Sequence, residues 1–433
     1  MSEKSQLQKA IDHHRGGRRE AARQAYQSIL KKNRDSVSAL HFYGVLLYEE
    51  GQHDKAIKYI RQALKISPDY FDAHNNLGNI YLEGNQVGLA KEHYESALKY
   101  NPKFADAHSN LGVLLTHLKE LPQAERHLAT AIELQPGNPD THANLATTYL
   151  FAQRGFAAEE QLQLALDIDP THNRSRSRLG QVLYALDKRD AAISLYREWL
   201  EREPGNALAE HYLAAFGGAA TPDRSSDAYV EQTFDNFADS FDRKLESLGY
   251  RVPQKIAELF EAPDRDSSNS SRQLGHVLDL GCGTGLCGPI LKPRCLRLTG
   301  VDLSQRMLNR ARQRNCYDEL VHSNLEDALA KYESSVDAIV AADVLIYLGC
   351  LENTFKLAKR AMVSGARFYF SLENARESVE SYRLEPHGRY VHNPGYVESL
   401  LEQTGFVGFK REELVVRQEL GQPVDGLLFE VKA

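Results

Sequence analysis

A glycine-rich turn is the first place in this sequence where residue types and spacing could hold a ligand. Residues 276–288 read HVLDLGCGTGLCG, which predicts a short buried strand, a turn and the start of a helix. Three glycines would let the backbone of the turn pass close to a ligand: Gly281, Gly283 and Gly285. Asp279 stands at the end of the strand, and Asp302 ends the next predicted strand, LRLTGVD, 23 residues further on. A carboxylate in that second place can accept hydrogen bonds from both hydroxyls of a ribose.

The spacing of the glycines narrows the kind of ligand. It is G-x-G-x-G, whereas dehydrogenases that bind a pyrophosphate have G-x-G-x-x-G. A dehydrogenase also needs a helix N-terminus that is free for the diphosphate. Here Asp279 opens the turn and suits the cationic amino-acid end of a ligand instead. The turn therefore favours a nucleoside that carries an amino acid over a dinucleotide.

A repeat of 34 residues organises the first half of the chain. Prolines recur at this period: Pro68, Pro102, Pro136, Pro170 and Pro204. Small residues hold a second column, in which Ala146 replaces glycine once: Gly44, Gly78, Gly112 and Gly180. The period is typical of stacked helix pairs. A small residue lets two antiparallel helices approach closely, and the proline ends the second helix of each pair.

These columns resemble the tetratricopeptide repeat family, as in LGNIYLEGNQVGLAKEHYESALKYNP at residues 77–102. The resemblance implies an all-α tetratricopeptide solenoid over residues 1–216, with about six repeats and a capping helix at 206–216. Solenoids of this kind present a groove, so we expect contact with a protein or peptide partner.

Three asparagines share one position of the repeat, in HNNLG, HSNLG and HANLA: Asn76, Asn110 and Asn144. The leucine after each of them belongs to the expected core, so the asparagines should edge the concave groove. A side-chain amide donates and accepts hydrogen bonds, as the backbone of an extended peptide requires. We therefore predict that these residues bind the partner. Helix packing is an alternative of equal weight.

The repeat period stops after Phe216, and the pattern of the chain changes. Residues 217–228 are small and polar and predict a linker, while 229–433 forms a second domain that opens with a helical segment at 229–253. In that domain DLGCGTG resembles the first motif of class I S-adenosylmethionine-dependent methyltransferases. The words VDAIVAADVLIYL and ARFYFSLE resemble their fourth and fifth strands. The resemblance implies an α/β, seven-stranded Rossmann-like fold that ends in an antiparallel pair near 407–419 and 424–431.

Three further words are similar to those of bacterial predicted methyltransferases with N-terminal tetratricopeptide repeats: FDNFADSFDRKLESLGYRVP, AADVLIYLG and RLEPHGRYVHNPGY. The resemblance implies S-adenosylmethionine as the cofactor and assigns roles to the turn. Its glycines would line the methionine and ribose, Asp279 would lie near the amino group, and Asp302 would bind the ribose hydroxyls. Asn324, in HSNLED, falls where the family often has an acid that accepts from the adenine amine. An asparagine oxygen can still accept there.

Candidates for the methyl-acceptor pocket fall in segments that follow predicted strands, because open α/β sheets bind ligands at the carboxyl ends of their strands. We assign four residues to catalysis: Asp343, Tyr347, His387 and His392. We assign three more to substrate binding: Glu373, Arg389 and Tyr390. Each has a structural alternative. Asp343 could instead cap the backbone of its loop, and Tyr347 could serve packing. The two histidines could simply be exposed to solvent, and Arg389 could pair with a structural acid.

Composition sets limits on the class of protein. With 433 residues, 42% hydrophobic and 26% charged, the chain suits two or three globular domains. Its mean hydropathy of -0.48 and the charged first 30 residues predict neither a membrane span nor a secretory signal. A net charge of -7 disfavours a partner such as nucleic acid. Five cysteines without a C-x-x-C pair predict a reducing cytoplasm and no metal site.

The sequence thus predicts an S-adenosylmethionine-dependent methyltransferase whose repeats recruit a protein or peptide substrate or partner. Two alternatives remain. In the first, the enzyme methylates a small molecule and the repeats are an assembly scaffold. In the second, the protein is a non-catalytic adaptor that senses S-adenosylmethionine.

Overall fold

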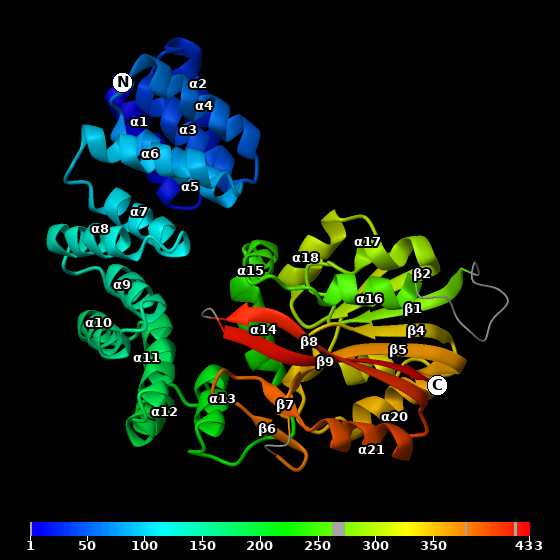
Figure 1. The fold of residues 1–433 in the computed structure, drawn as a ribbon. Helices are drawn as coiled ribbons and strands as arrows, with labels where there is room; N and C mark the ends of the chain where they lie inside the picture. Colours follow the sequence, from blue (N-terminus) through cyan, green and yellow to red (C-terminus); the bar gives the residue numbers. More distant parts are fainter. Residues whose placement is uncertain (1, 262–272, 377–378, 420–421) are drawn as a thin grey trace. The chain divides into compact units, whose positions relative to one another are not determined.

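Antiparallel helix pairs make up the first half of the computed structural model, which describes residues 2–261, 273–376, 379–419 and 422–433 (Figure 1). The helices are α1 (Glu3–Arg15), α2 (Arg19–Lys32), α3 (Val37–Glu49), α4 (His53–Ile66), α5 (Phe71–Glu83), α6 (Val87–Tyr100), α7 (Ala105–His117), α8 (Leu121–Leu134), α9 (Pro139–Phe151), α10 (Gly155–Ile168), α11 (Asn173–Ala185), α12 (Arg189–Arg202) and α13 (Ala207–Ala215). The predicted helical repeats are confirmed. None of the described helices is long and apolar enough to cross a bilayer.

The small-residue column explains why the two helices of a pair pack so closely. A Cβ added at Gly78 would lie 2.6 Å from the ring of Tyr94, and one added at Gly112 would lie 2.6 Å from Leu128. Tyr94 and Leu128 are the large residues of the second helices, and both are buried. Each large side chain therefore fills the space that the glycine opposite leaves open.

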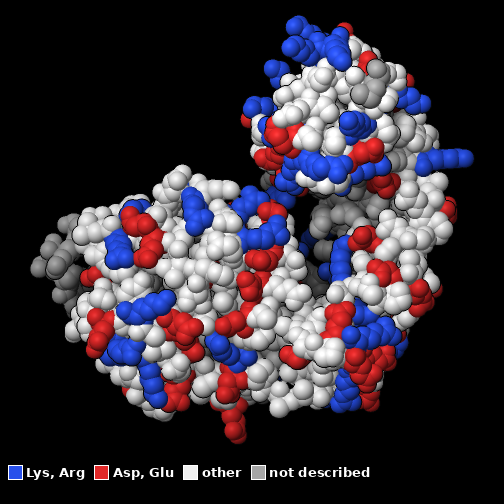
Figure 2. Space-filling model, turned by 180° about the vertical axis from the view of Figure 1, so that it is seen from behind, with Lys and Arg blue, Asp and Glu red and all other residues white. Residues whose placement is uncertain are grey.

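The chain divides into two compact units, residues 1–182 and 183–433. Helix α11 runs across the division, so α12 and α13 belong to the second unit. Figure 2 shows Lys and Arg side chains gathered at one end of the first unit, and charges of both signs intermixed over the visible face of the second.

One mixed sheet forms the centre of the second unit. Its described strands are β1 (Leu274–Leu280), β2 (Cys295–Asp302), β3 (Glu319–His322), β4 (Val336–Ala341), β5 (Met362–Asn374), β6 (Tyr382–Leu384), β7 (Tyr390–His392), β8 (Val407–Glu419) and β9 (Gln422–Lys432). The parallel strands lie in the order β3-β2-β1-β4-β5, and antiparallel β9 joins β5 to β8. This is the predicted Rossmann-like arrangement of seven strands. The hairpin of β6 and β7, three residues each, is an addition at the end of β5.

Alternating side chains along the strands build two apolar layers. Val277 on β1 packs with helix α16 (Val252–Glu261), while its neighbour Leu278 packs with α20 (Glu352–Ala361) and α21 (Pro394–Gln403). Figure 1 shows α16 on one side of the sheet and α20 and α21 on the other. Three further helices follow β1, β2 and β3 in the chain: α17 (Gly288–Leu291), α18 (Gln305–Gln313) and α19 (Leu325–Leu329).

The predicted helical segment at 229–253 is broken into separate helices. Helix α14 (Asp227–Phe237) begins at Ser226, whose hydroxyl accepts a hydrogen bond from the Tyr229 N–H. After a turn at 238–240 the chain continues in α15 (Phe241–Ser247). The preceding residues, within the predicted linker, are tied to the loop between β4 and α20, because Asp223 O accepts bonds from Gly349 N (2.8 Å) and Cys350 N (2.9 Å). Helix α14 is thereby held at the carboxyl end of β4.

Candidate cofactor and acceptor site

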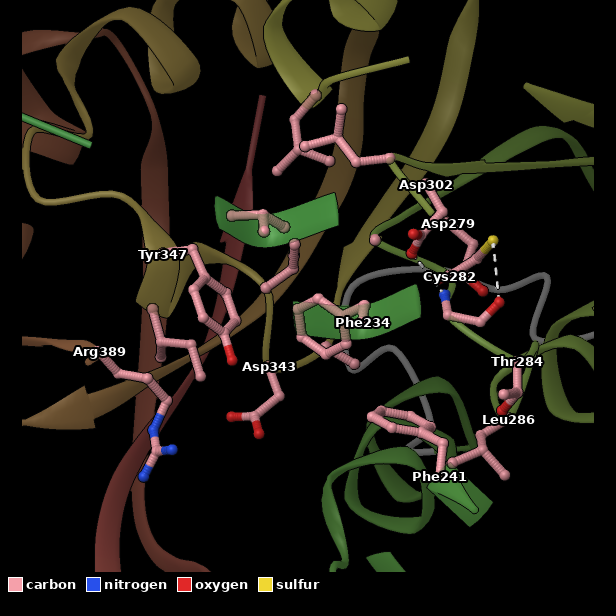
Figure 3. Close-up of a pocket in the computed structure, with 18 of the residues that line it drawn as sticks. Phe234, Phe241, Asp279, Cys282, Thr284, Leu286, Asp302, Asp343, Tyr347 and Arg389 are labelled. Atoms are coloured by element: carbon pink, nitrogen blue, oxygen red, sulfur yellow. Dashed lines mark hydrogen bonds between the residues drawn. The ribbon is translucent and has the colours of Figure 1, made fainter. Parts of the chain in front are cut away.

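A cavity of the second unit opens at the carboxyl ends of β1, β2 and β4 (Figure 3). The glycine turn after β1 lines one part of it, and the loop after β4 lines another. Helices α14 and α15 contribute apolar side chains between the two. This is the place where an open α/β sheet leaves a crevice for ligands.

The glycine turn has a backbone that other residues adopt only with strain. Gly281, Gly283 and Gly285 have φ values of 64°, 54° and 83°. A Cβ at Gly281 would also overlap Val344 in the loop after β4. The Gly283 N–H donates to Asp302 Oδ2 at 2.8 Å, which joins the turn to the end of β2. The predicted turn and the second acid are therefore one hydrogen-bonded unit.

Both carboxylic acids of this unit, Asp279 and Asp302, have pKa values above their usual range. Burial raises the pKa of Asp279 to about 7, although the Tyr317 hydroxyl donates to its Oδ2 at 2.6 Å and opposes the shift. Burial also raises the pKa of Asp302 to about 6, against the N–H groups of Ser304 and Gly283. A cationic ligand would favour the charged form of these carboxylates.

Helices α14 and α15 cover the turn with aromatic side chains. Phe234 and Phe241 project into the cavity in Figure 3, and a Cβ at Gly283 would lie 3.6 Å from the Phe241 ring. Asp242 on α15 accepts hydrogen bonds from Thr284 of the turn and from Arg314. These contacts were not predicted from the sequence. The word FDNFADSFDRK, with its phenylalanines and aspartates, was the signal that could have found them.

Asp343 lies in the loop directly after β4, on the opposite side of the cavity from Asp279 in Figure 3. It has a φ of 58°, and its N–H donates to Ser371 Oγ at 2.8 Å. Its Oδ2 accepts from Arg417 Nη1 at 2.7 Å, but its Oδ1 is buried and has no partner among the described residues. Burial raises the pKa of Asp343, and Arg417 opposes this shift.

Tyr347 stands beside Asp343, and both side chains point into the cavity in Figure 3. Its ring packs edge-on against Phe234, with 5.4 Å between the ring centroids. Burial raises the pKa of its hydroxyl, so the phenol is neutral near pH 7. The residue thus combines the predicted packing role with a hydroxyl that faces the cavity.

An ion-pair network supports this side of the cavity. Arg389 Nε lies 2.5 Å from Glu373 Oε1 and its Nη2 lies 2.7 Å from Glu419. Arg417 pairs with the same two glutamates and with Asp343. Burial alone would raise the pKa of Glu419, but Arg389 and Arg417 hold it at about 2. Arg417 and Glu419 were not predicted as site residues, because an alternating edge strand such as β8 offers no local signal for them.

The comparisons with known proteins agree with this geometry. A family model described as a methyltransferase domain matches residues 278–370, and tetratricopeptide repeat models match residues 44–83 and 75–139. The chain contains tetratricopeptide repeats and an S-adenosylmethionine-dependent methyltransferase domain. It is therefore a methyltransferase of the EC 2.1.1 class. No curated protein matches it.

Several solved structures are similar to about half of the chain or less. PilF of Pseudomonas aeruginosa is 20% identical to the chain, with a TM-score of 0.43. The match covers 49% of the chain and 96% of PilF. A tetratricopeptide repeat protein of Thermus thermophilus is 24% identical over 42% of the chain and 100% of its own, with a TM-score of 0.37. An S-adenosylmethionine-dependent methyltransferase of Leishmania major is 14% identical over 48% of the chain and 82% of its own, with a TM-score of 0.39.

The donor set of the methyltransferase domain fits its cofactor. The glycine turn lines the cavity with its backbone, and two buried carboxylates with raised pKa values, Asp279 and Asp302, line it as well. Asp279 would hold the cationic amino group and Asp302 the ribose. When bound, the cofactor supplies an electrophilic methyl group on a sulfonium sulfur.

Asn324 lines the same cavity but also caps a helix. Its Oδ1 accepts from the Asp327 N–H at 2.8 Å at the start of α19, and its Nδ2 donates to Asp227 at 3.1 Å. The pattern N-x-x-D in HSNLED is typical of such a cap. A contact of Asn324 with adenine therefore stays a prediction, and the oxygen it would use already accepts one hydrogen bond.

Glu373 and two residues of the β6–β7 hairpin do not line the cavity. Glu373 is buried behind Arg389 and Arg417, which hold its pKa below the usual range against burial. His392 is fully buried, its Nε2 lies 3.1 Å from Gly349 O, and burial lowers its pKa to about 4. Tyr390 is also fully buried and donates to Pro222 O at 2.7 Å. The expectation of a solvent-exposed His392 is thus wrong, because the hairpin packs against residues 222 and 349.

His387 is the partly exposed histidine of this segment. Its Nε2 lies 3.3 Å from Glu373 Oε2, and 38% of its side chain is exposed. Burial lowers its pKa, and Arg389 adds to this effect. Of the predicted catalytic and substrate residues in this domain, the structure brings Asp343, Tyr347 and Arg389 to the cavity.

The three asparagines of the solenoid link neighbouring repeats. Asn76 Nδ2 lies 2.8 Å from His41 Nε2, and Asn110 Nδ2 donates to Asn75 Oδ1 at 3.0 Å. Asn144 Oδ1 accepts from Arg174 at 3.0 Å. All three are half-buried. In each asparagine, one polar atom of the amide thus serves helix packing. Binding of a partner by these residues stays a prediction.

Proposed function

We propose that this methyltransferase modifies a protein or peptide that its tetratricopeptide repeats recruit. The observation that carries the proposal is the half-buried asparagine column, in which Asn76, Asn110 and Asn144 recur at one position of three successive repeats. A regular spacing of amides along a solenoid matches the regular spacing of peptide groups in an extended ligand. Tetratricopeptide repeats typically bind proteins or peptides.

In the methyltransferase domain, each part of the cavity has its own task under this proposal. The glycine turn, Asp279 and Asp302 hold the cofactor, and Phe234 and Phe241 exclude water above it. Asp343 and Tyr347 orient the acceptor group, since their side chains point into the other half of the cavity. The main contribution of the chain is positioning of the acceptor and removal of its proton.

The proposal is tested with methyl-labelled S-adenosylmethionine, the full-length protein and fractionated lysate. We expect label in a discrete protein band. The triple variant Asn76→Ala, Asn110→Ala and Asn144→Ala should lower that labelling at least tenfold, because three amide contacts worth about 0.5–1.5 kcal/mol each would be lost. Its affinity for S-adenosylhomocysteine should stay unchanged.

A matched control changes three exposed residues that also share one repeat position, on the second helices: Glu92→Ala, Arg126→Ala and Glu160→Ala. This variant should label the band as the parent protein does. Label confined to small solutes would contradict recruitment of a protein. Equal loss in both triple variants would also contradict it, since the asparagines would then have no special part.

A further inference from the structure

The two guanidinium groups at the acceptor side of the cavity are already used by carboxylates of the protein. Arg389 pairs with Glu373 and Glu419, and Arg417 pairs with those two and with Asp343. An acceptor with a carboxylate or phosphate that binds these arginines would have to displace one of these pairs. The pair of Arg417 with Glu373 is fully buried, and the pairs with Glu419 are partly exposed. Breaking a buried pair leaves an uncompensated charge, which is costly. The network therefore disfavours an anionic acceptor.

The charges of this network do not cancel. Asp343, Glu373 and Glu419 supply three carboxylates, and two arginines face them. The neighbouring His387 has a pKa below its usual value because of burial, so it adds no charge near pH 7. One negative charge remains in a partly desolvated place, where a cationic ligand would be stabilised.

The unpaired negative charge can be assigned to one carboxylate oxygen. Asp343 Oδ1 is buried and has no hydrogen-bond partner in the described part of the chain, whereas Oδ2 is held by Arg417 at 2.7 Å. Asp343 also has a φ of 58°, a conformation that a residue other than glycine adopts at a cost. An unsatisfied buried acceptor on a strained residue indicates a place prepared for a donor from outside the chain.

The walls around this oxygen suit a cation with an apolar stem. Phe234 and Tyr347 lie edge to face at 5.4 Å, and both rings border the cavity. Aromatic faces attract ammonium groups and also pack against methylene groups. Such walls favour an alkylamine over a hydroxyl, which carries no charge.

We infer that the methyl acceptor is the nitrogen of an amine that enters the cavity as a cation and donates to Asp343 Oδ1. The inference rests on the proposed methyl transfer at this site and names its acceptor class. The ammonium gives one proton to Asp343 Oδ1, and the nitrogen lone pair then forms a bond to the methyl carbon. The carbon–sulfur bond breaks and sulfur keeps its electron pair. The product is a methylammonium, and Asp343 returns its proton to water.

A binding experiment on the full-length protein with S-adenosylhomocysteine tests the acceptor class without turnover. The probes are Nα-acetyl-lysine amide and the uncharged Nα-acetyl-norleucine amide, titrated by calorimetry. We expect the lysine probe to bind at least tenfold more tightly. Asp343→Asn, which presents an amide in place of the free oxygen, should abolish this preference. Affinity for S-adenosylhomocysteine should change less than threefold, which shows that the variant is folded.

The control Glu398→Gln, on α21, alters the ion pair of Glu398 with Arg411 of β8. It should keep the preference for the lysine probe. Equal binding of both probes by the parent protein would overturn the inference. So would tighter binding of Nα-acetyl-glutamate amide.

Product analysis separates this inference from the proposed function. An alkali-stable N-methylamine in a protein would support both. N-methylamines found only among small solutes would support the acceptor class and overturn recruitment of a protein. Label in a protein that alkali releases as methanol would support recruitment and overturn the amine. Labelled methyl groups on oxygen in small solutes would overturn both.

Discussion

Gly281 and Gly283 both have positive φ, yet a side chain would meet different surroundings at the two positions. A Cβ at Gly281 would overlap Val344, whereas one at Gly283 would lie 3.6 Å from Phe241. Gly281 therefore lets the turn approach the loop after β4 closely, and Gly283 contributes only its backbone conformation. The residue pattern alone treats the two glycines as equal.

We expect Gly281→Ala to damage the cofactor site more than Gly283→Ala. Both carry the strain of a positive φ, which costs about 1–3 kcal/mol, and Gly281→Ala must also displace Val344. Calorimetric binding of S-adenosylhomocysteine should be weakened about tenfold by Gly283→Ala and clearly more by Gly281→Ala. Equal affinities of the two variants would show that the contact with Val344 does not matter.

Several candidate residues follow from the sequence, but their surroundings do not. Asp343 is visible as an acid after a predicted strand, while Arg417, which pairs with it, lies 74 residues away in sequence. Tyr317, which donates to Asp279, is 38 residues away. Such pairings depend on how the strands are ordered in the sheet, and no local pattern reports them.

At the scale of the helices, a histidine pair recurs between the two helices of successive repeats. His74 Nδ1 lies 3.0 Å from His93 Nδ1, and His108 Nδ1 lies 2.9 Å from His127 Nδ1. The other ring nitrogen of His74 donates to Pro68 O, so its Nδ1 is left to accept from a neutral His93. In the next repeat, His142 Nδ1 bonds to Gln161 Oε1 at 2.8 Å instead.

The histidine pairs should make the solenoid sensitive to acid. Burial, with His74 beside it, lowers the pKa of His93 to about 4, and burial and His108 lower that of His127. The unfolded chain thus binds more protons than the folded one below pH 6.5. The free energy of unfolding should fall as the pH drops from about 6.5 to 4, by about 1 kcal/mol for the His93 pair because its ring is partly solvated. The His127 pair should act in the same direction.

Gln161 stands at the repeat position of His93 and His127 and bonds to His142, which suggests the substitution that tests these pairs. His93→Gln with His127→Gln keeps a hydrogen-bonding side chain and removes the titrating ring, so unfolding in urea should depend less on pH in this range. The measurement is the urea midpoint at pH 7 and pH 4.5. A pH dependence equal to that of the parent protein would rule out these pairs as its source.

At the scale of the whole molecule, the second unit includes more than the predicted methyltransferase domain. Helix α13 is joined to it through His211, whose Nε2 lies 2.9 Å from Gly388 O and whose ring stacks on Tyr229 at 3.7 Å. Gly388 precedes Arg389, a residue of the cavity wall. The helix that caps the repeats in sequence therefore supports the turn between β6 and β7, which carries Arg389.

We expect a chain that begins at residue 188 to be more stable than one that begins at residue 217. The shorter chain loses α12 and α13, leaves Gly388 O without its hydrogen bond and exposes Tyr229, at a cost of about 2–4 kcal/mol. Thermal unfolding of the two fragments with S-adenosylhomocysteine checks this. Full-length His211→Ala should lie between them. Equal melting temperatures would show that α13 is not part of the stable unit.

The sequence by itself determined the features that depend on local spacing. These are the helical repeats from the period of 34, and the strand, turn and acid of the cofactor site. The Rossmann-like order of elements followed from the resemblance of DLGCGTG and the later strand segments to class I methyltransferases. Only the tertiary structure decided that 229–253 is broken into helices over the cavity and that His392 is buried. It also decided that Asp343, beside Arg417, keeps one oxygen without a partner among the described residues. The physical reason is that burial and charge pairing are properties of residues that folding brings together from distant parts of the chain.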